Sequence, residues 1–242
     1  MDKSKNLHGH LFALTANVMW GLMAPIGKSA LQEFSALSVT TFRMIGAAAA
    51  FWMLSIFCKQ EHVNHRDMLK IFFASLFALV FNQGIFIFGL SMTSPIDASI
   101  VTTTLPIVTM IVAAIYLKEP ITNKKVLGIF VGAMGALILI LSSQAASGGN
   151  RNLIGDLLCL VAQISFSIYL TVFKGLSQQY SAVTINKWMF VYASICYIPF
   201  SYYDISTIQW TSISTVAIIQ VLYVVLGGSC IIHNQSVHPD LA

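Results

Sequence analysis

Nine residues of this chain place polar groups, aromatic rings or a helix-interrupting proline inside long apolar stretches, where polar groups in particular are costly and need an explanation. Amides such as Asn17 and Gln163 both donate and accept hydrogen bonds, and a guanidinium attracts carboxylates. Together these groups would suit a cavity that binds a small neutral or zwitterionic molecule. The candidates for this substrate-binding set are Asn17, Trp20, Arg43, Asn82, Gln83, Thr102, Pro106, Gln163 and Tyr192.

Several candidates also have a purely structural interpretation. Asn17 and Gln163 could instead form interhelical hydrogen bonds, which contribute about 1 kcal/mol in a membrane. Arg43 lies near the start of its apolar stretch, so its side chain could reach outward to the interface or guide a substrate carboxylate. Trp20 and Tyr192 could be packing residues or interface anchors.

The remaining candidates lie next to one another or share one helical face. Asn82 and Gln83 are adjacent and would point about 100° apart on a helix, so at most one can dominate a cavity. Pro106 frees the backbone carbonyl of Thr102, which gives either a substrate ligand or a simple kink closed by threonine hydroxyls.

The acidic residues restrict the kind of solute. All 9 fall in loops or at the ends of apolar stretches. A carrier that exchanges protons for cationic drugs needs a carboxylate deep in the membrane, so such a pump is disfavoured. An exporter or facilitator of neutral or zwitterionic metabolites fits better.

Catalytic and metal-binding chemistry find little support. A membrane-embedded enzyme would need clustered His, Asp or Glu, and His62 with His65 is the nearest approach to a cluster. The 4 cysteines are scattered and show no metal-ligand spacing. The sequence predicts no cofactor, no metal and no enzymatic activity.

The elements that must position these residues are membrane-spanning helices. Of the 242 residues, 57% are hydrophobic and only 9% are charged, which excludes an ordinary soluble domain. An all-α bundle of about eight transmembrane helices is predicted. The expected spans are 9–30, 37–58, 69–90, 98–117, 126–141, 153–173, 185–203 and 213–232.

The basic residues predict the orientation. A cytoplasmic N-terminus places 10 of the 13 basic residues inside, with Lys28 and Arg151 outside and Arg43 within a span. Because the basic residues are scattered between apolar runs, they indicate membrane topology and no nucleic-acid partner. The expected partners are the lipid bilayer and a small-molecule substrate.

The chain contains an internal repeat. The segment from Gly9 to Ala36 aligns without gaps on the segment from Gly155 to Ala182, an offset of 146 residues. Ser35 and Ala36 are matched by identical residues, as are Lys28 and Gln32. Five predicted spans separate the copies, so the second copy is inverted. Inverted repeats are typical of secondary transporters, whose halves open a central site to either side in turn.

Two segments also resemble the EamA family of the drug/metabolite transporter superfamily. Residues 20–49 carry Trp20, Gly21, Pro25, Lys28 and Arg43, and residues 94–140 carry Pro106, Glu119, Thr122, Gly128 and Gly135. The resemblance implies a bundle of ten helices in two five-helix halves. It also implies transport of small metabolites such as amino acids across a bacterial inner membrane.

The second half departs from the family pattern. Residues 1–146 are expected to form a complete five-helix repeat and residues 147–242 an incomplete repeat of three helices, ending in a polar tail that looks truncated or frame-shifted. An inactive fragment of a transporter is therefore an alternative to a working carrier, and a membrane-embedded enzyme is a weaker one. Missing helices could also favour a homodimer that covers the exposed faces.

Overall fold

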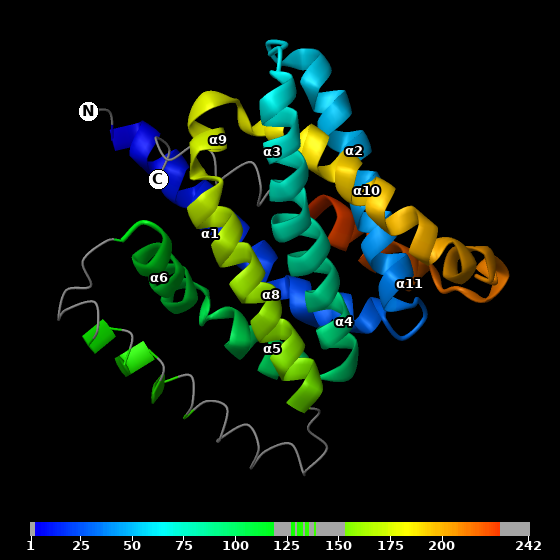
Figure 1. Ribbon diagram of the computed structural model, residues 1–242. Coiled ribbons are helices and arrows are strands. Elements are labelled where there is room, and N and C mark those ends of the chain that lie inside the picture. Colours follow the sequence, from blue (N-terminus) through cyan, green and yellow to red (C-terminus); the bar gives the residue numbers. More distant parts are fainter. Residues whose placement is uncertain are drawn as a thin grey trace. The chain divides into compact units, whose positions relative to one another are not determined.

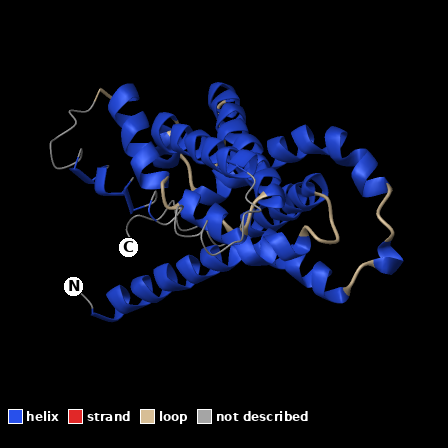
Figure 2. Cartoon of the chain, turned by 90° about the horizontal axis from the view of Figure 1, so that it is seen from below, coloured by secondary structure: helices blue, strands red, loops and turns tan. Residues whose placement is uncertain are grey.

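The chain is helical throughout the described residues. The computed structural model describes residues 3–118, 127–128, 130–132, 134–135, 138 and 153–227, with side chains in the first helix described at 14, 15, 18, 19 and from 21 onward. Every regular element in this part of the chain is a helix (Figure 2). The predicted all-α fold is confirmed.

The helices form two compact units, here called unit 1 and unit 2. Unit 1 contains residues 1–72 and 176–242, and unit 2 contains residues 73–175. The helices of unit 1 are α1 (Lys3–Ala30), α2 (Ala36–Phe57), α10 (Ala182–Ser206), the short η2 (Trp210–Ser212) and α11 (Thr215–Val225) (Figure 1). Those of unit 2 are the π-helical η1 (Leu76–Gly84), α4 (Ile85–Met92), α5 (Pro95–Thr102), α6 (Leu105–Tyr116) and α8 (Leu153–Val172). Helices α3 (His65–Ser75) and α9 (Lys174–Gln179) carry the chain from one unit to the other.

The two units do not coincide with the two predicted repeats. Each unit combines helices from both sides of residue 146. Interleaved inverted repeats can produce this division, because equivalent helices of the two halves pack against each other. The repeat boundaries at 1–146 and 147–242 stay a prediction.

Four helical segments of the described chain are long and apolar enough to cross a bilayer. They are Ala36–Phe57, His65–Met92, Pro95–Tyr116 and Leu153–Val172, which match the second, third, fourth and sixth predicted spans. Helices α1 and α10 cover the first and seventh, and α11 covers part of the eighth. The fifth, 126–141, lies only partly within the described residues. These helices identify a multi-pass membrane protein.

Serine residues determine where four of the helices begin. Ser35, Ser94, Ser181 and Ser214 precede α2, α5, α10 and α11, and each hydroxyl oxygen accepts the backbone N–H three residues later at 3.1–3.3 Å. These N-caps satisfy donors that a helix leaves unpaired, and losing one typically costs about 1 kcal/mol.

In unit 1, α2 packs along α10. The Phe51 and Phe190 rings are fully buried and stack with their centroids 5.6 Å apart. Helix α11 packs against α2 at Gly46, where a Cβ atom would overlap the side chain of Val225.

In unit 2, α4 crosses α8 at very short range. A Cβ atom on Gly89 would lie 2.8 Å from the backbone oxygen of Gly155, and one on Gly155 would lie 2.9 Å from that of Gly89. Beside this crossing, the Thr93 hydroxyl donates to Asp156 Oδ1 at 2.6 Å. This close approach of the two backbones therefore requires glycine at both positions.

Pro106 divides the fourth predicted span into α5 and α6. The hydroxyls of Thr102, Thr103 and Thr104 donate to backbone carbonyls of the preceding turn at 2.6–2.8 Å. The Ala98, Ile100 and Val101 carbonyls accept these bonds. The interruption is thus a kink lined by threonines.

Candidate functional site

Unit 2 gathers buried and half-buried polar side chains from η1, α6 and α8. The amide of Asn82, on η1, donates to the backbone carbonyl of Ala162 on α8 at 2.9 Å. Gln83 follows in η1 and is only 6% exposed, and its Oε1 has no hydrogen-bond partner among the described residues. Gln163, 4% exposed, lies next to Ala162 on α8. Three amides are thus brought into one region of unit 2.

Helix α8 supplies a polar stripe to this region, made of Gln163, Ser167 and Thr171. These residues recur every four positions and are all buried. Ser167 and Thr171 donate to the carbonyls of Gln163 and Ser167 at 2.9 and 2.8 Å. The Ser167 hydroxyl also lies 3.0 Å from that of Thr109 on α6, which links the stripe to a second helix.

The π-helical turn explains why Asn82 and Gln83 differ. Nine residues of the third span form the wider helix η1, which changes the angle between successive side chains and so re-aims both amides. Asn82 is thereby used for packing against α8, whereas Gln83 keeps an unpaired acceptor. Such turns are frequent at functional sites.

The other predicted residues of unit 2 lie at the kink. Thr102 is half-buried and donates to Ala98, and Pro106 is exposed at the start of α6.

The predicted residues of unit 1 are packed among side chains. Arg43 is only 3% exposed. One of its contacts is a hydrogen bond that its Nη2 donates to Met23 Sδ at 3.7 Å. Tyr192 places its ring against Phe72 with centroids 5.5 Å apart, and its hydroxyl points at Met68 Sδ, 3.8 Å away. The side chains of Asn17 and Trp20 lie outside the described residues.

Some polar residues of these regions were not in the predicted set. The polar residues of unit 2 described above, here called the unit 2 cluster, are Asn82, Gln83, Thr109, Gln163, Ser167 and Thr171. Ser167 and Thr109 are members that were not predicted, and the four-residue spacing from Gln163 could have indicated Ser167. In unit 1, Lys187 is only 5% exposed, lies 5.2 Å above the Trp52 ring and donates weakly to Gln60 Oε1 at 3.5 Å. No sequence signal distinguished Lys187 from the other basic residues at span ends.

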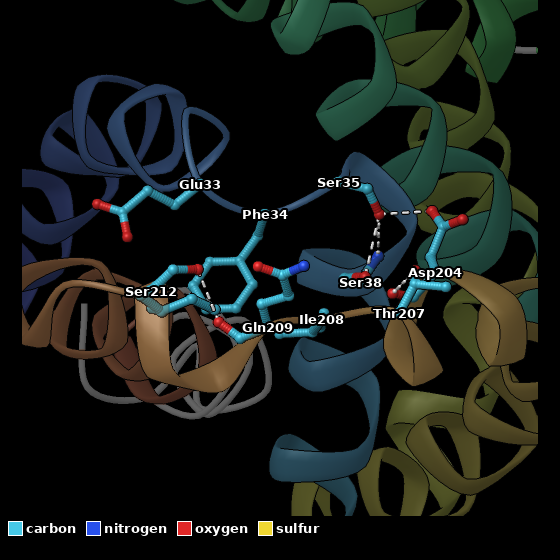
Figure 3. A pocket seen from close by; sticks show the side chains of 10 residues that line it. Glu33, Phe34, Ser35, Ser38, Asp204, Thr207, Ile208, Gln209 and Ser212 are labelled. Carbon is cyan, nitrogen blue, oxygen red and sulfur yellow. Dashed lines mark hydrogen bonds between the residues drawn. The ribbon is translucent and has the colours of Figure 1, made fainter.

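Unit 1 also contains a cavity of about 420 Å³ where α2 begins and α10 ends (Figure 3). Two carboxylates line it, and each is hydrogen-bonded to a serine. The Ser35 hydroxyl donates to Asp204 Oδ2 at 2.6 Å, and the Ser214 N–H and hydroxyl donate to Glu33 at 2.7 and 2.6 Å. The bonds from Ser214 lower the pKa of Glu33 below its ordinary value, against a smaller opposing effect of burial.

None of the nine predicted residues lines this cavity. Its other walls are hydroxyl, amide and apolar side chains, namely Phe34, Ser38, Thr207, Ile208, Gln209, Ser212 and Ile213. No grouping of three or more His, Cys, Asp or Glu suited to a metal occurs among the residues that the structure describes.

Comparison with known proteins agrees with the membrane architecture. The model of the EamA-like transporter family matches residues 7–141, more than half of the chain. An uncharacterized transporter of Archaeoglobus fulgidus is 28% identical over 78% of this chain and 66% of its own length. The uncharacterized transporter YetK of Bacillus subtilis is 21% identical over 86% of this chain and 64% of its own.

The similarity extends to a plant protein. A WAT1-related protein of Arabidopsis thaliana is 26% identical over 68% of this chain and 52% of its own length. The chain therefore spans about two thirds or less of each of these three relatives.

Proposed function

Because the chain belongs to the EamA-like transporter family, we propose that it exports small metabolites such as amino acids by alternating access between two inverted repeats. Its family and its relatives identify a membrane transporter and not an enzyme. The solute, the direction and the mechanism are the parts that we propose.

The unpaired Oε1 of Gln83 is the observation that carries the proposal. A buried acceptor with no donor is costly, so an unpaired one indicates a missing partner. A solute with an amino or other N–H group would provide the missing donor. Asn82 and Gln163 lie in the same region and offer further amide groups.

We propose roles in substrate binding for the other predicted residues as well. Thr102 and Pro106 flank the kink, where we propose that the backbone carbonyl of Thr102, to which Pro106 has no N–H to donate, serves a ligand. Arg43 is buried, so we propose that it attracts a substrate carboxylate from within unit 1. Asn17, Trp20 and Tyr192 complete the proposed set.

The charge of the proposed site favours a neutral or zwitterionic solute. Asp97 and Asp156 lie in the first turns of α5 and α8, so the carboxylates of these two spans lie at helix ends and not at mid-depth. The polar groups of the unit 2 cluster are amides and hydroxyls, which bind without requiring a net charge on the ligand.

Location and assembly are further proposals. Bacterial relatives such as YetK support a bacterial inner membrane, and the predicted distribution of basic residues supports a cytoplasmic N-terminus. We also propose a homodimer, and native mass spectrometry of the purified protein would measure the oligomeric state.

Transport in proteoliposomes tests the proposed function. We expect saturable exchange of labelled neutral amino acids that does not strictly require a pH gradient. Empty liposomes and liposomes with an unrelated membrane protein are the controls. Strict dependence on the gradient would contradict the uncoupled mechanism, and absence of any exchange would contradict the carrier itself.

A further inference from the structure

Helices α2 and α10 are equivalent members of the two repeats. They begin at Ala36 and Ala182, which are 146 residues apart, as are their N-cap residues Ser35 and Ser181. Both serines use the same hydrogen bond to start the helix. The pair is therefore a contact between a helix and its own counterpart.

Two contacts outside this pair repeat at the same offset. In unit 1, the Tyr223 hydroxyl donates to the backbone carbonyl of Met19 at 3.0 Å. In unit 2, the Ser165 hydroxyl donates to that of Phe77 at 2.7 Å. Positions 19 and 165 are 146 residues apart, and so are positions 77 and 223. The repeat relation extends from the sequence to helix contacts.

A carboxylate joins α2 to α10 at one end of the pair. Ser35, before α2, donates to Asp204 near the end of α10 at 2.6 Å (Figure 3). Figure 3 shows that Ser35 also reaches Ser38, at 3.0 Å. Since the start of α2 meets the end of α10, the helices run in opposite directions.

The other end is joined by the same chemistry. The Ser181 N–H and hydroxyl, before α10, donate to Glu61 Oε2 at 2.9 and 3.0 Å. Burial acts to raise the pKa of Glu61, but the bonds from Ser181 and Thr184 and the charge of Lys187 hold it below its ordinary value. Glu61 is therefore an anion at neutral pH and can accept both hydrogen bonds from Ser181 there.

These ties distinguish the pair from a gate. In an alternating-access carrier a gate is open at one end while it is closed at the other. The α2–α10 pair is tied at both ends in one structure, and the Phe51–Phe190 stack joins it between them. Moreover, alternating access between inverted repeats exchanges the conformations of the two repeats. An interface made of one helix and its counterpart has the same two partners after this exchange, so it need not change.

We infer that α2 and α10 form a fixed post, around which other helices of the carrier move. The inference rests on the proposed function, because it assigns a role within alternating access. It places the moving contacts outside this pair and predicts that joining α2 to α10 covalently leaves transport intact.

Covalent joining tests the post directly. The background has Cys58, Cys159, Cys196 and Cys230 changed to alanine. Ser35→Cys with Asp204→Cys joins one end, and Glu61→Cys with Ser181→Cys joins the other. A short bis-methanethiosulfonate reagent, which forms a reducible disulfide with each cysteine and releases methanesulfinate, cross-links each pair in proteoliposomes. The same variant treated with quenched reagent is the reference. Single-cysteine variants control for modification without cross-linking.

We expect the cross-linked carriers to transport within about twofold of their references, because a post does not change length or angle during the cycle. A larger loss that a reducing agent reverses overturns the inference while leaving the proposed function standing. The double-cysteine variant without a cross-link could fail to transport although the cysteine-free protein transports. In that case the hydrogen bonds that were removed are themselves required, and spin labels replace the cross-link as the test.

The labels would be placed on the exposed faces of the two helices, at Ile56→Cys and Ile195→Cys, away from the ties. A distance between them that substrate leaves unchanged supports the post, and a distance that substrate shifts overturns it. The cysteine-free protein could fail to transport although the unmodified chain transports. The same distance is then measured with labels at these two sites in a protein that keeps the buried Cys159. Failure of the unmodified chain to transport overturns the proposed function, and the inference falls with it.

Discussion

Gln83 illustrates how a single buried atom can indicate function. Most buried polar atoms in proteins have a hydrogen-bond partner, and one without a partner deserves an explanation. Here the unpaired Oε1 belongs to a residue of a π-helical turn and follows a second amide, Asn82, in the chain. A ligand that donates to it would explain both the atom and the turn.

Replacing Gln83 with leucine separates stability from function. The change removes a buried acceptor that costs about 1–3 kcal/mol when unpaired, so we expect the melting temperature in detergent to stay equal or rise. Transport should fall by about tenfold or more, since a hydrogen bond worth about 1.4 kcal/mol corresponds to that factor. Gln178→Leu, at an exposed amide of α9, is the matched control. Equal transport by both variants would contradict a binding role.

Glu33 predicts a pH dependence of stability. The bonds from Ser214 lower its pKa in the folded protein, so their stabilisation is present above the ordinary pKa of the carboxyl and is lost as pH falls through the lowered value. We expect the melting temperature to decline on acidification, and Glu33→Gln should decline less. The measurement is thermal unfolding in detergent across the acidic range, and identical declines for the two proteins would refute it.

At the scale of elements, small residues and serine caps decide how the helices meet. Glycines at the α4–α8 crossing bring two backbones together, whereas serines set the first residue of α2 and α10. Membrane helices use small residues for close approach because lipid gives apolar side chains little reason to associate.

Gly155→Ala tests the close crossing of α4 and α8. The new Cβ would lie 2.9 Å from the Gly89 backbone oxygen, so one helix must shift, and overpacking of this kind typically costs about 1–3 kcal/mol. We expect lower stability against denaturation in mixed detergent. Gly175→Ala is the control, because a Cβ there meets nothing within 4 Å. A loss of stability in Gly175→Ala as large as that in Gly155→Ala would argue against the crossing.

The Ser181–Glu61 tie can be measured by a double-mutant cycle. Ser181→Ala removes the cap of α10 and should cost about 1 kcal/mol by that effect alone. Glu61→Gln weakens the bond across the pair, and the double variant should lose less than the sum of the two single losses. Additive losses of unfolding free energy would show that the Ser181 hydroxyl does not interact with Glu61.

At the scale of the whole molecule, each compact unit combines helices from both predicted repeats. The first two helices share unit 1 with α10 and α11, and unit 2 contains the remaining described spans. Such interleaving ties the two halves together, as the bonds at both ends of the α2–α10 pair show.

Native Cys58 tests the predicted threading through the membrane. Cys58 is exposed just after α2, and Gln209 is exposed just after α10. An impermeant thiol reagent should label Cys58 only in inside-out vesicles. In a Cys58→Ala background, Gln209→Cys should be labelled in intact cells. Labelling of both sites from the same side would contradict the opposite orientations of the two helices.

The sequence by itself determined the all-helical architecture, most of the span positions and the 146-residue offset. These features depend on local composition, since a chain in hydrocarbon must satisfy its backbone groups within each helix. The serines that begin α2 and α10 were likewise visible as identical residues of the repeat.

Only the tertiary structure decided which polar groups meet. It assigned Asn82 to packing and Gln83 to the unpaired acceptor, buried Arg43 beside Met23, and joined Thr109 to Ser167. It also paired Ser35 with Asp204, residues 169 positions apart. Such contacts depend on which helix faces are opposed and on a local change of helical pitch, and neither follows from the hydrophobic pattern of one segment.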